Sequence, residues 1–181
     1  MRVITGSARG RRLETLEGED VRPTTDRIKE AVFSIIQFQT EGRRFLDLFA
    51  GSGQMGIEAL SRGAKEAVFV DNAKKSVETV KRNLKATKLE IGAKVFQADF
   101  RSFLSMNSQP FDIAFLDPPY RTGTLGDALA QVCAHMNDTG VIIAENPLDE
   151  DLSENYGDFV RDRQYRYGKI KITTYRHKDF L

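Results

Sequence analysis

The residues whose types and spacing most directly suggest chemistry are Asp117-Pro118-Pro119-Tyr120, which follow the apolar run Phe111–Leu116. This run predicts a buried strand, so the tetrapeptide stands where the backbone must turn. Two consecutive prolines fix φ and remove two N–H donors, which holds the nearby carbonyls rigidly. A carboxylate, fixed carbonyls and an aromatic ring would together suit a planar base that bears an exocyclic amine. The alternative is a proline-terminated strand whose tyrosine simply packs.

Three further aspartates stand at or near the C-terminal ends of predicted strands. They are Asp47, Asp71 and Asp99, and Asp117 makes a fourth. Because ligands of open parallel sheets bind outside the carboxyl ends of the strands, we expect all four side chains around one crevice. A single aspartate there often caps a helix, but four around one crevice are not explained by capping alone. Such a crevice would repel a pyrophosphate and attract a cationic amine or sulfonium.

A glycine-rich segment joins the first of these strands to a predicted helix. Gly51, Gly53 and Gly56 match G-x-G-x-x-G, and Asp71 follows about 20 residues after the first glycine, as dinucleotide binding requires. The motif alone is weak, and it leaves open an NAD(P)-dependent oxidoreductase or a non-catalytic nucleotide-binding module. The carboxylate of Asp47 favours S-adenosylmethionine instead, because this cofactor carries a sulfonium, an α-amino group, ribose hydroxyls and adenine.

Alternating strands and helices would position these residues. Helices are predicted over Thr25–Gln37, Met55–Arg62, Lys74–Lys85, Arg101–Ser105 and Leu125–Met136. The remaining strands are predicted over Phe45–Ala50, Ala67–Val70, Lys94–Gln97, Gly140–Ala144, Phe159–Tyr167 and Lys169–Arg176. We therefore expect an α/β fold with a single doubly wound, mostly parallel, seven-stranded Rossmann-like sheet, a C-terminal antiparallel hairpin and an N-terminal arm. One domain would span residues 1–181, with the arm at 1–20, a leading helix within 21–40 and the catalytic core at 44–181.

Composition narrows the class of protein. The chain has 181 residues, a net charge of +1 and 40% hydrophobic residues, but no apolar run approaches the ~20 residues that span a bilayer. The N-terminus lacks the apolar region of a secretory signal. Cys133 is the only cysteine, which excludes an intramolecular disulfide and a thiolate metal cluster. We expect a cytoplasmic monomer with no metal and no membrane partner.

Cationic side chains gather locally although the chain is nearly neutral. Residues 145–158 include six acidic and no basic residues, whereas residues 161–178 include seven lysines and arginines and one acid. This asymmetry can build a local positive patch. Candidate phosphate ligands, for RNA if the substrate is one, are the arginines beside the glycine-containing turn of the arm and beside the tetrapeptide: Arg9, Arg11, Arg12, Arg22 and Arg121. A solvated arm is the alternative for the first three.

Taken in order, these motifs resemble the RsmD-like family of bacterial 16S ribosomal RNA guanine-N2 methyltransferases, which are class I S-adenosylmethionine-dependent enzymes. The resemblance runs nearly end to end, through Arg2–Gly6 with Arg9–Leu13, Arg22–Arg27, Asp47–Gly53 with Gly56–Ala64, and Asp117–Tyr120. Gln54-Met55 departs from the small apolar pair expected there, which concerns helix packing more than chemistry.

The resemblance implies a cofactor, a substrate and a role for each motif. The cofactor would be S-adenosylmethionine, and the methyl acceptor would be the N2 amine of a guanine in small-subunit ribosomal RNA, naked or within an assembly intermediate. Asp117 and the Pro118 carbonyl would accept the protons of the amine, and Tyr120 would stack on the base. The cofactor residues would be Asp47, Ala50, Gly51, Gly53, Asp71, Asn72, Asp99 and Phe100. DNA adenine-N6 methylation is the nearest alternative, and methylation of protein glutamine or of small amines stays open.

Overall fold

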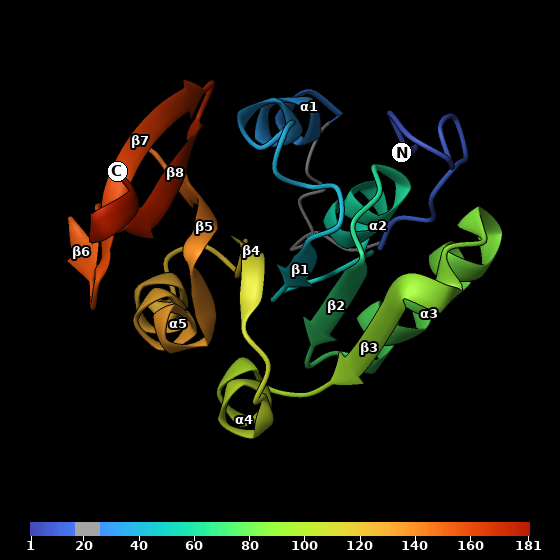
Figure 1. The fold of residues 1–181 in the computed structure, drawn as a ribbon. Helices are drawn as coiled ribbons and strands as arrows, with labels where there is room; N and C mark the ends of the chain where they lie inside the picture. The colour runs from blue at the N-terminus through green and yellow to red at the C-terminus, as the bar shows by residue number, and fades with distance from the viewer. Residues whose placement is uncertain (17–25) are drawn as a thin grey trace.

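The computed structural model describes residues 1–16 and 26–181. In these residues one sheet has eight strands in the order β3-β2-β1-β4-β5-β8-β7-β6 (Figure 1). The parallel strands are β1 (Arg44–Asp47), β2 (Glu66–Asp71), β3 (Ala93–Gln97), β4 (Phe111–Leu116) and β5 (Met136–Pro147). The antiparallel strands are β6 (Asn155–Tyr156), β7 (Phe159–Tyr167) and β8 (Ile170–His177). The seven predicted strands and the C-terminal hairpin are confirmed, and the two-residue β6 extends the edge.

Helices cover both faces of the sheet, as Figure 1 shows. One face carries α1 (Asp26–Ile35), α2 (Gln54–Ser61) and α3 (Lys74–Thr87), and the other carries α4 (Phe100–Met106) and α5 (Thr124–Val132). Within residues 1–16 and 26–181, no helix is both long and apolar enough to cross a membrane. The placement of helices on both faces of the mostly parallel sheet confirms the doubly wound class I architecture expected from the sequence.

The two faces of the sheet divide the hydrophobic core into two clusters. On β4, Ile113 and Phe115 pack with α1, α2 and α3, whereas Ala114 and Leu116 pack with α4 and α5. Successive side chains of a strand point to opposite faces, and here both faces are covered. This explains why β4 is apolar at every position except Asp112.

One predicted boundary was wrong at the start of β5. Met136 was assigned to the end of a helix, but α5 ends at Val132, a 3₁₀ turn covers Cys133–His135, and Met136 begins the strand. Met136 is only 7% exposed, because it packs into the cluster beneath α4 and α5. The polar residues 137–139 interrupt the apolar pattern from which the start of this strand would be predicted. They lie where the register of β5 against β4 shifts, between Phe111 and Ile113.

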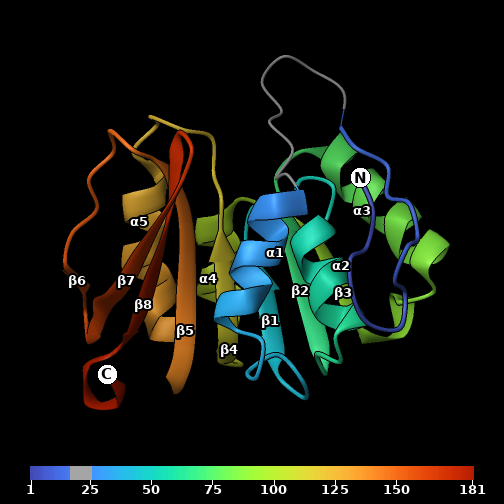
Figure 2. The same ribbon diagram turned by 90° about the horizontal axis from the view of Figure 1, so that it is seen from above.

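The N-terminal arm lies against α2 and α3 and makes little regular structure (Figure 2). Its two ends are joined by one antiparallel bridge between Arg2 and Arg12. Gly6 has φ of +89°, and a Cβ there would lie 1.7 Å from the carbonyl oxygen of Ser61. Only glycine permits this approach, which lets the backbone N–H of Ser7 donate to the same oxygen at 2.8 Å.

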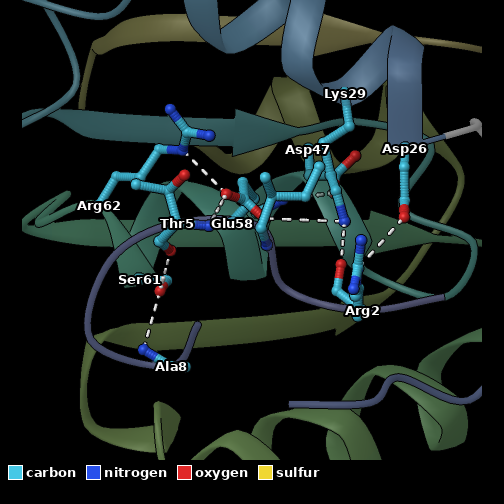
Figure 3. A network of polar contacts seen from close by, with 11 residues as sticks. Arg2, Thr5, Ala8, Asp26, Lys29, Asp47, Glu58, Ser61 and Arg62 are labelled. Atoms are coloured by element: carbon cyan, nitrogen blue, oxygen red, sulfur yellow. Dashed lines mark hydrogen bonds and ion pairs between the residues drawn. The ribbon is translucent and has the colours of Figure 1, made fainter. Parts of the chain in front are cut away.

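Glu58 on α2 is the centre of a buried polar network (Figure 3). Its Oε2 accepts from the N–H of Ile4 at 2.8 Å and lies 3.7 Å from Nζ of Lys29, while Oε1 accepts from the N–H of Thr5 at 3.0 Å. Nε of Arg62 also donates to Oε1, at 2.9 Å. Lys29 and Glu58 are both fully buried, and burial lowers the pKa of Lys29. The network ties α1 and the arm to the helix that begins at the glycine loop.

Candidate active site

A cavity of about 550 Å³ opens at the C-terminal edge of the parallel strands. It lies at the point where the strand order reverses between β1 and β4, the usual ligand site of doubly wound sheets. Asp47, Asp71, Asp99 and Asp117 all line it. The four carboxylates therefore share one cavity, whose volume suits a ligand of cofactor size.

Asp47 is the most deeply buried of these acids, at 2% exposed. Its Oδ2 accepts a hydrogen bond from the N–H of Gly56 at 3.0 Å, near the start of α2. Burial raises the pKa of Asp47 to about 7, against the hydrogen bond from Gly56, and the charge of Asp71 raises it further. A cation in the cavity would favour the ionised form of this carboxylate.

Asp71 organises the glycine loop from the end of β2. Its Oδ2 accepts from the N–H of Gly51 at 2.9 Å, and its Oδ1 accepts from the N–H of Ala73 at 2.9 Å. A carboxylate offers about four lone-pair sites, so two are left for the hydroxyls of a ligand. Asn72 lies beside it on the cavity wall.

Asp99 caps α4 while it lines the cavity. Its Oδ1 accepts from the N–H of Arg101 at 2.9 Å, so the capping role considered for a single aspartate is present here. The adjacent Phe100 is 4% exposed, and its ring centroid lies 5.5 Å from that of Phe49. These two rings give this end of the cavity an apolar wall next to a carboxylate.

The three glycines of the loop have different surroundings. Ala50 and Gly51 line the cavity, but Gly53 and Gly56 do not. A Cβ on Gly53 would lie 3.0 Å from Val80 Cγ2, and one on Gly56 would lie 2.3 Å from a ring carbon of Phe69. Gly53, which we expected at the cofactor, instead lies behind the loop, where it and Gly56 permit close packing of helix on strand.

The tetrapeptide follows β4 and lines the same cavity. Asp117 and Tyr120 are half-buried, Pro118 is buried and Pro119 is exposed. The hydroxyl of Tyr120 donates to Oε1 of Glu145 on β5 at 2.7 Å. The aromatic ring is thus held at its outer edge by a neighbouring strand as well as by its own rigid backbone.

Sequence reasoning missed Glu145, although a signal was present. This acid directly follows the apolar stretch Val141–Ala144, so β5 carries an acidic residue near its C-terminal end as the first four strands do. Glu145 is 4% exposed, and buried carboxylates normally have a specific partner. The other four acids were selected because they stand at or near the C-terminal ends of predicted strands, and Glu145 meets the same criterion.

Two residues at the end of the arm were also missed. Thr15 and Leu16 line the cavity beside the glycine loop. They are held there through Asn83 of α3, whose side chain accepts from the N–H of Glu14 at 2.8 Å and donates to the carbonyl oxygen of Ser52 at 2.9 Å. The arm therefore contributes part of the cavity wall.

The arginines of the arm are not brought to the cavity. Arg9, Arg11 and Arg12 are exposed, and the guanidinium of Arg11 donates to the carbonyl oxygen of Ala86 at 3.0 Å. Ala86 lies ten residues, or about 15 Å, along α3 from Ser76, which lines the cavity. Any RNA contact by these arginines would therefore lie well away from the base pocket.

The other two candidate arginines differ from each other. Nη2 of Arg121 lies 2.7 Å from Oδ2 of Asp149, and both side chains are exposed at the edge of the tetrapeptide. Arg22 lies outside the described residues. Of the four candidate arginines that the structure describes, Arg121 is the one beside the site.

Cys133 is not arranged as a nucleophile. Its Sγ donates to the carbonyl oxygen of Leu129 at 3.0 Å, and burial raises the pKa of the thiol to about 12. It is half-buried in the 3₁₀ turn after α5, and it does not line the cavity.

Comparison with known proteins finds similarity over nearly the whole chain. The model of the family described as Conserved hypothetical protein 95 matches residues 1–176. The chain is 40% identical to YlbH of Bacillus subtilis, proposed to be an rRNA methyltransferase, over 98% of this chain and 100% of that one. It is 31% identical to ribosomal RNA small subunit methyltransferase D of Escherichia coli, over 98% and 90% respectively. The solved structure of Escherichia coli yhhF, proposed to be a methyltransferase, superposes with a TM-score of 0.88 at 29% identity, over 98% and 97% of the two chains.

Proposed function

Since the chain belongs to the family described as Conserved hypothetical protein 95, the family of the RsmD-like methyltransferases, we propose that it methylates the N2 amine of a guanine in small-subunit ribosomal RNA, with S-adenosylmethionine as donor. The observation that carries the proposal is the cavity that Asp47, Asp71, Asp99 and Asp117 line together. The names of the relatives support ribosomal RNA as the substrate class.

The cavity fits S-adenosylmethionine by the chemistry of its donors and acceptors. Asp47 is the buried anion for the cationic methionine part, and Asp71 keeps lone pairs for the ribose hydroxyls. Asp99 would accept from the adenine amine, and Phe100 would cover the ring. A dinucleotide fits less well, because its pyrophosphate would lie against the carboxylate of Asp47.

The tetrapeptide would present the acceptor amine. The bound cofactor supplies an electrophilic methyl group on a sulfonium, so the task of the protein is to aim the nitrogen lone pair at it. Asp117 and the Pro118 carbonyl would accept the two N–H bonds of the amine, which draws the lone pair out of conjugation with the ring. Positioning of this kind can contribute up to ~7–11 kcal/mol. Asp117 would also stabilise the positive charge that develops on the nitrogen.

Tyr120 would hold the target base by stacking, which contributes about 1–3 kcal/mol per base. Its hydrogen bond to Glu145 restrains the ring before the base arrives. Glu145 would therefore act as a positioning residue for the base pocket, since it touches Tyr120 rather than the reacting atoms.

The deciding experiment is transfer of labelled methyl groups followed by nucleoside analysis. Naked 16S ribosomal RNA, small subunits, duplex DNA and bulk protein would each be offered to the enzyme. We expect label in N2-methylguanosine from one of the ribosomal substrates, and a rate about 10²–10³-fold lower from the Asp117→Asn variant. Label in N6-methyladenine of DNA would move the proposal to the nearest alternative, and absence of label from every acceptor would refute it.

A further inference from the structure

A second cavity, of about 580 Å³, adjoins the first one. Tyr120 lines both of them and is the one lining residue that they share. The remaining lining residues come from the segment after the tetrapeptide, the end of β5 and the tip of the β7–β8 hairpin: Arg121, Pro147, Leu148, Asp149 and Lys169.

Two cations from distant parts of the chain meet in this second cavity. Arg121 directly follows the tetrapeptide, and Lys169 follows Gly168 at the hairpin tip, where φ is +60°. The N–H of Leu148 donates to the carbonyl oxygen of Lys169 at 3.2 Å, which ties the hairpin tip to the end of β5. The position of Lys169 is thus fixed by the backbone, even though its side chain is exposed.

The backbone of Arg121 is unusual. Its φ is +60°, a value that in the described residues only Lys88 shares among non-glycine residues. Such conformations persist where the surrounding structure enforces them, and they cluster at functional sites. Arg121 in this conformation lines the second cavity and not the first.

The ion pair of Arg121 leaves it available to an anion. Its partner is Asp149, and the two side chains are 74% and 63% exposed. Exposed pairs of this kind contribute little to stability, whereas a guanidinium binds a phosphate through two parallel hydrogen bonds. A phosphate can therefore replace Asp149 as the partner of Arg121 at a small cost in stability.

We propose that the second cavity binds the backbone phosphate next to the target nucleotide, through Arg121 and Lys169. This inference rests on the proposed function, because it takes Tyr120 to stack on the target base in the first cavity. An RNA strand that leaves that base must pass Tyr120, and the two cations lie on the other side of it. Pro147 and Leu148 offer an apolar floor to the adjoining sugar.

The test compares RNA binding and methyl transfer for variants that remove these charges. Arg121→Asn keeps a residue that tolerates positive φ, and Lys169→Gln keeps length and polarity. Lys81→Gln is the matched control, since Lys81 is an exposed lysine on α3 that lines neither cavity. The double variant should lower the slope of log K against log salt by about 0.7–0.9, the value for one phosphate contact. It should also lower kcat/KM for RNA about tenfold.

Affinity for S-adenosylmethionine, measured by calorimetry, should stay at the wild-type value in all variants. If the double variant matches Lys81→Gln while wild type methylates ribosomal RNA, the phosphate site is refuted and the proposed function stands. A parallel loss of cofactor affinity would also refute it, because the second cavity would then belong to the cofactor site. If wild type methylates no RNA at all, the proposed function fails and the phosphate site fails with it.

Discussion

The two halves of the cavity are held together in different ways. On the glycine-loop side, backbone N–H groups fix Asp47, Asp71 and Asp99 over separations of 9, 20 and 2 residues. On the tetrapeptide side, Tyr120 depends on Glu145, a side chain 25 residues away on another strand. We call the side with Asp47, Asp71 and Asp99 the cofactor half and the side with Tyr120 the base half, after their proposed roles. In the cofactor half the carboxylates are fixed by backbone N–H groups, mostly of nearby residues in the same sequence motifs. The base half is set by contacts between side chains, which are easier to change without unfolding the protein.

The largest effect on stability is expected from a substitution in the buried Glu58 network, which contacts the helix that follows the glycine loop. Glu58→Gln removes the charge that faces the fully buried Lys29, so an uncompensated cation is left in the interior. We expect the free energy of unfolding to fall by about 3–5 kcal/mol, measured by urea denaturation.

Glu78→Gln is the matched control for that substitution. Glu78 pairs with Lys74 on the surface of α3, where the two side chains are 52% and 78% exposed. Its loss should cost no more than about 1 kcal/mol. Equal effects of the two substitutions would show that the Glu58 network does not support the cofactor half.

A substitution at the tetrapeptide should separate chemistry from cofactor binding. Asp117→Asn keeps the shape of the side chain but removes the charge that would face the developing ammonium. We expect kcat to fall about 10²–10³-fold, by analogy with the loss of one transition-state contact, while affinity for S-adenosylmethionine stays near wild type. Undiminished turnover in steady-state assays would remove Asp117 from the reaction.

Asp47 links cofactor binding to pH. Its folded-state pKa is about 7 against an ordinary value of 3.8, so the folded protein binds this proton more tightly than the unfolded chain does. Stability should therefore fall as pH rises from about 4 to about 7, by at most about 4 kcal/mol. Asp47→Asn should abolish that fall in denaturation curves.

The same substitution should weaken S-adenosylmethionine binding about tenfold or more at about pH 8, and less at about pH 6, where wild-type Asp47 is largely protonated. Calorimetry at the two pH values measures this difference. A binding loss that is independent of pH would contradict the role of Asp47 as the buried anion.

The smallest effect should come from the Tyr120–Glu145 contact. Glu145→Leu removes the acceptor of the Tyr120 hydroxyl, whereas Glu145→Gln keeps one in its amide oxygen. We expect about a tenfold fall in kcat for the leucine variant, little change for glutamine, and wild-type cofactor affinity in both. If the two variants lose activity equally, the charge of Glu145 rather than its hydrogen bond is what matters.

The sequence predicted the strand ends that line the cavity better than the contacts between strands, for a physical reason. β4 was predicted with its observed bounds, Phe111–Leu116, because a strand buried on both faces is apolar at all but one of its positions and two prolines follow soon after it. The four aspartates followed from their places at strand ends. Glu145 obeys the same rule but was missed, and its contact with Tyr120 depends on which strand neighbours β4.

Contacts made between distant segments were the hardest to predict. Lys29 is spaced from Val32 and Ile36 as a residue of the buried helix face, yet its partner Glu58 appears only once α1, α2 and the arm are assembled. The sequence likewise did not indicate that Arg11 donates to the carbonyl oxygen of Ala86 on α3, and its contact with phosphate stays a prediction.

The most direct test of the central claim is a binding comparison between S-adenosylmethionine and NADH on the wild-type protein, by thermal shift and calorimetry. If the cavity holds a cationic methyl donor among its acids, S-adenosylmethionine will raise the melting temperature in a saturable way and NADH will not. Saturable stabilisation by NADH, with none by S-adenosylmethionine, would contradict the account.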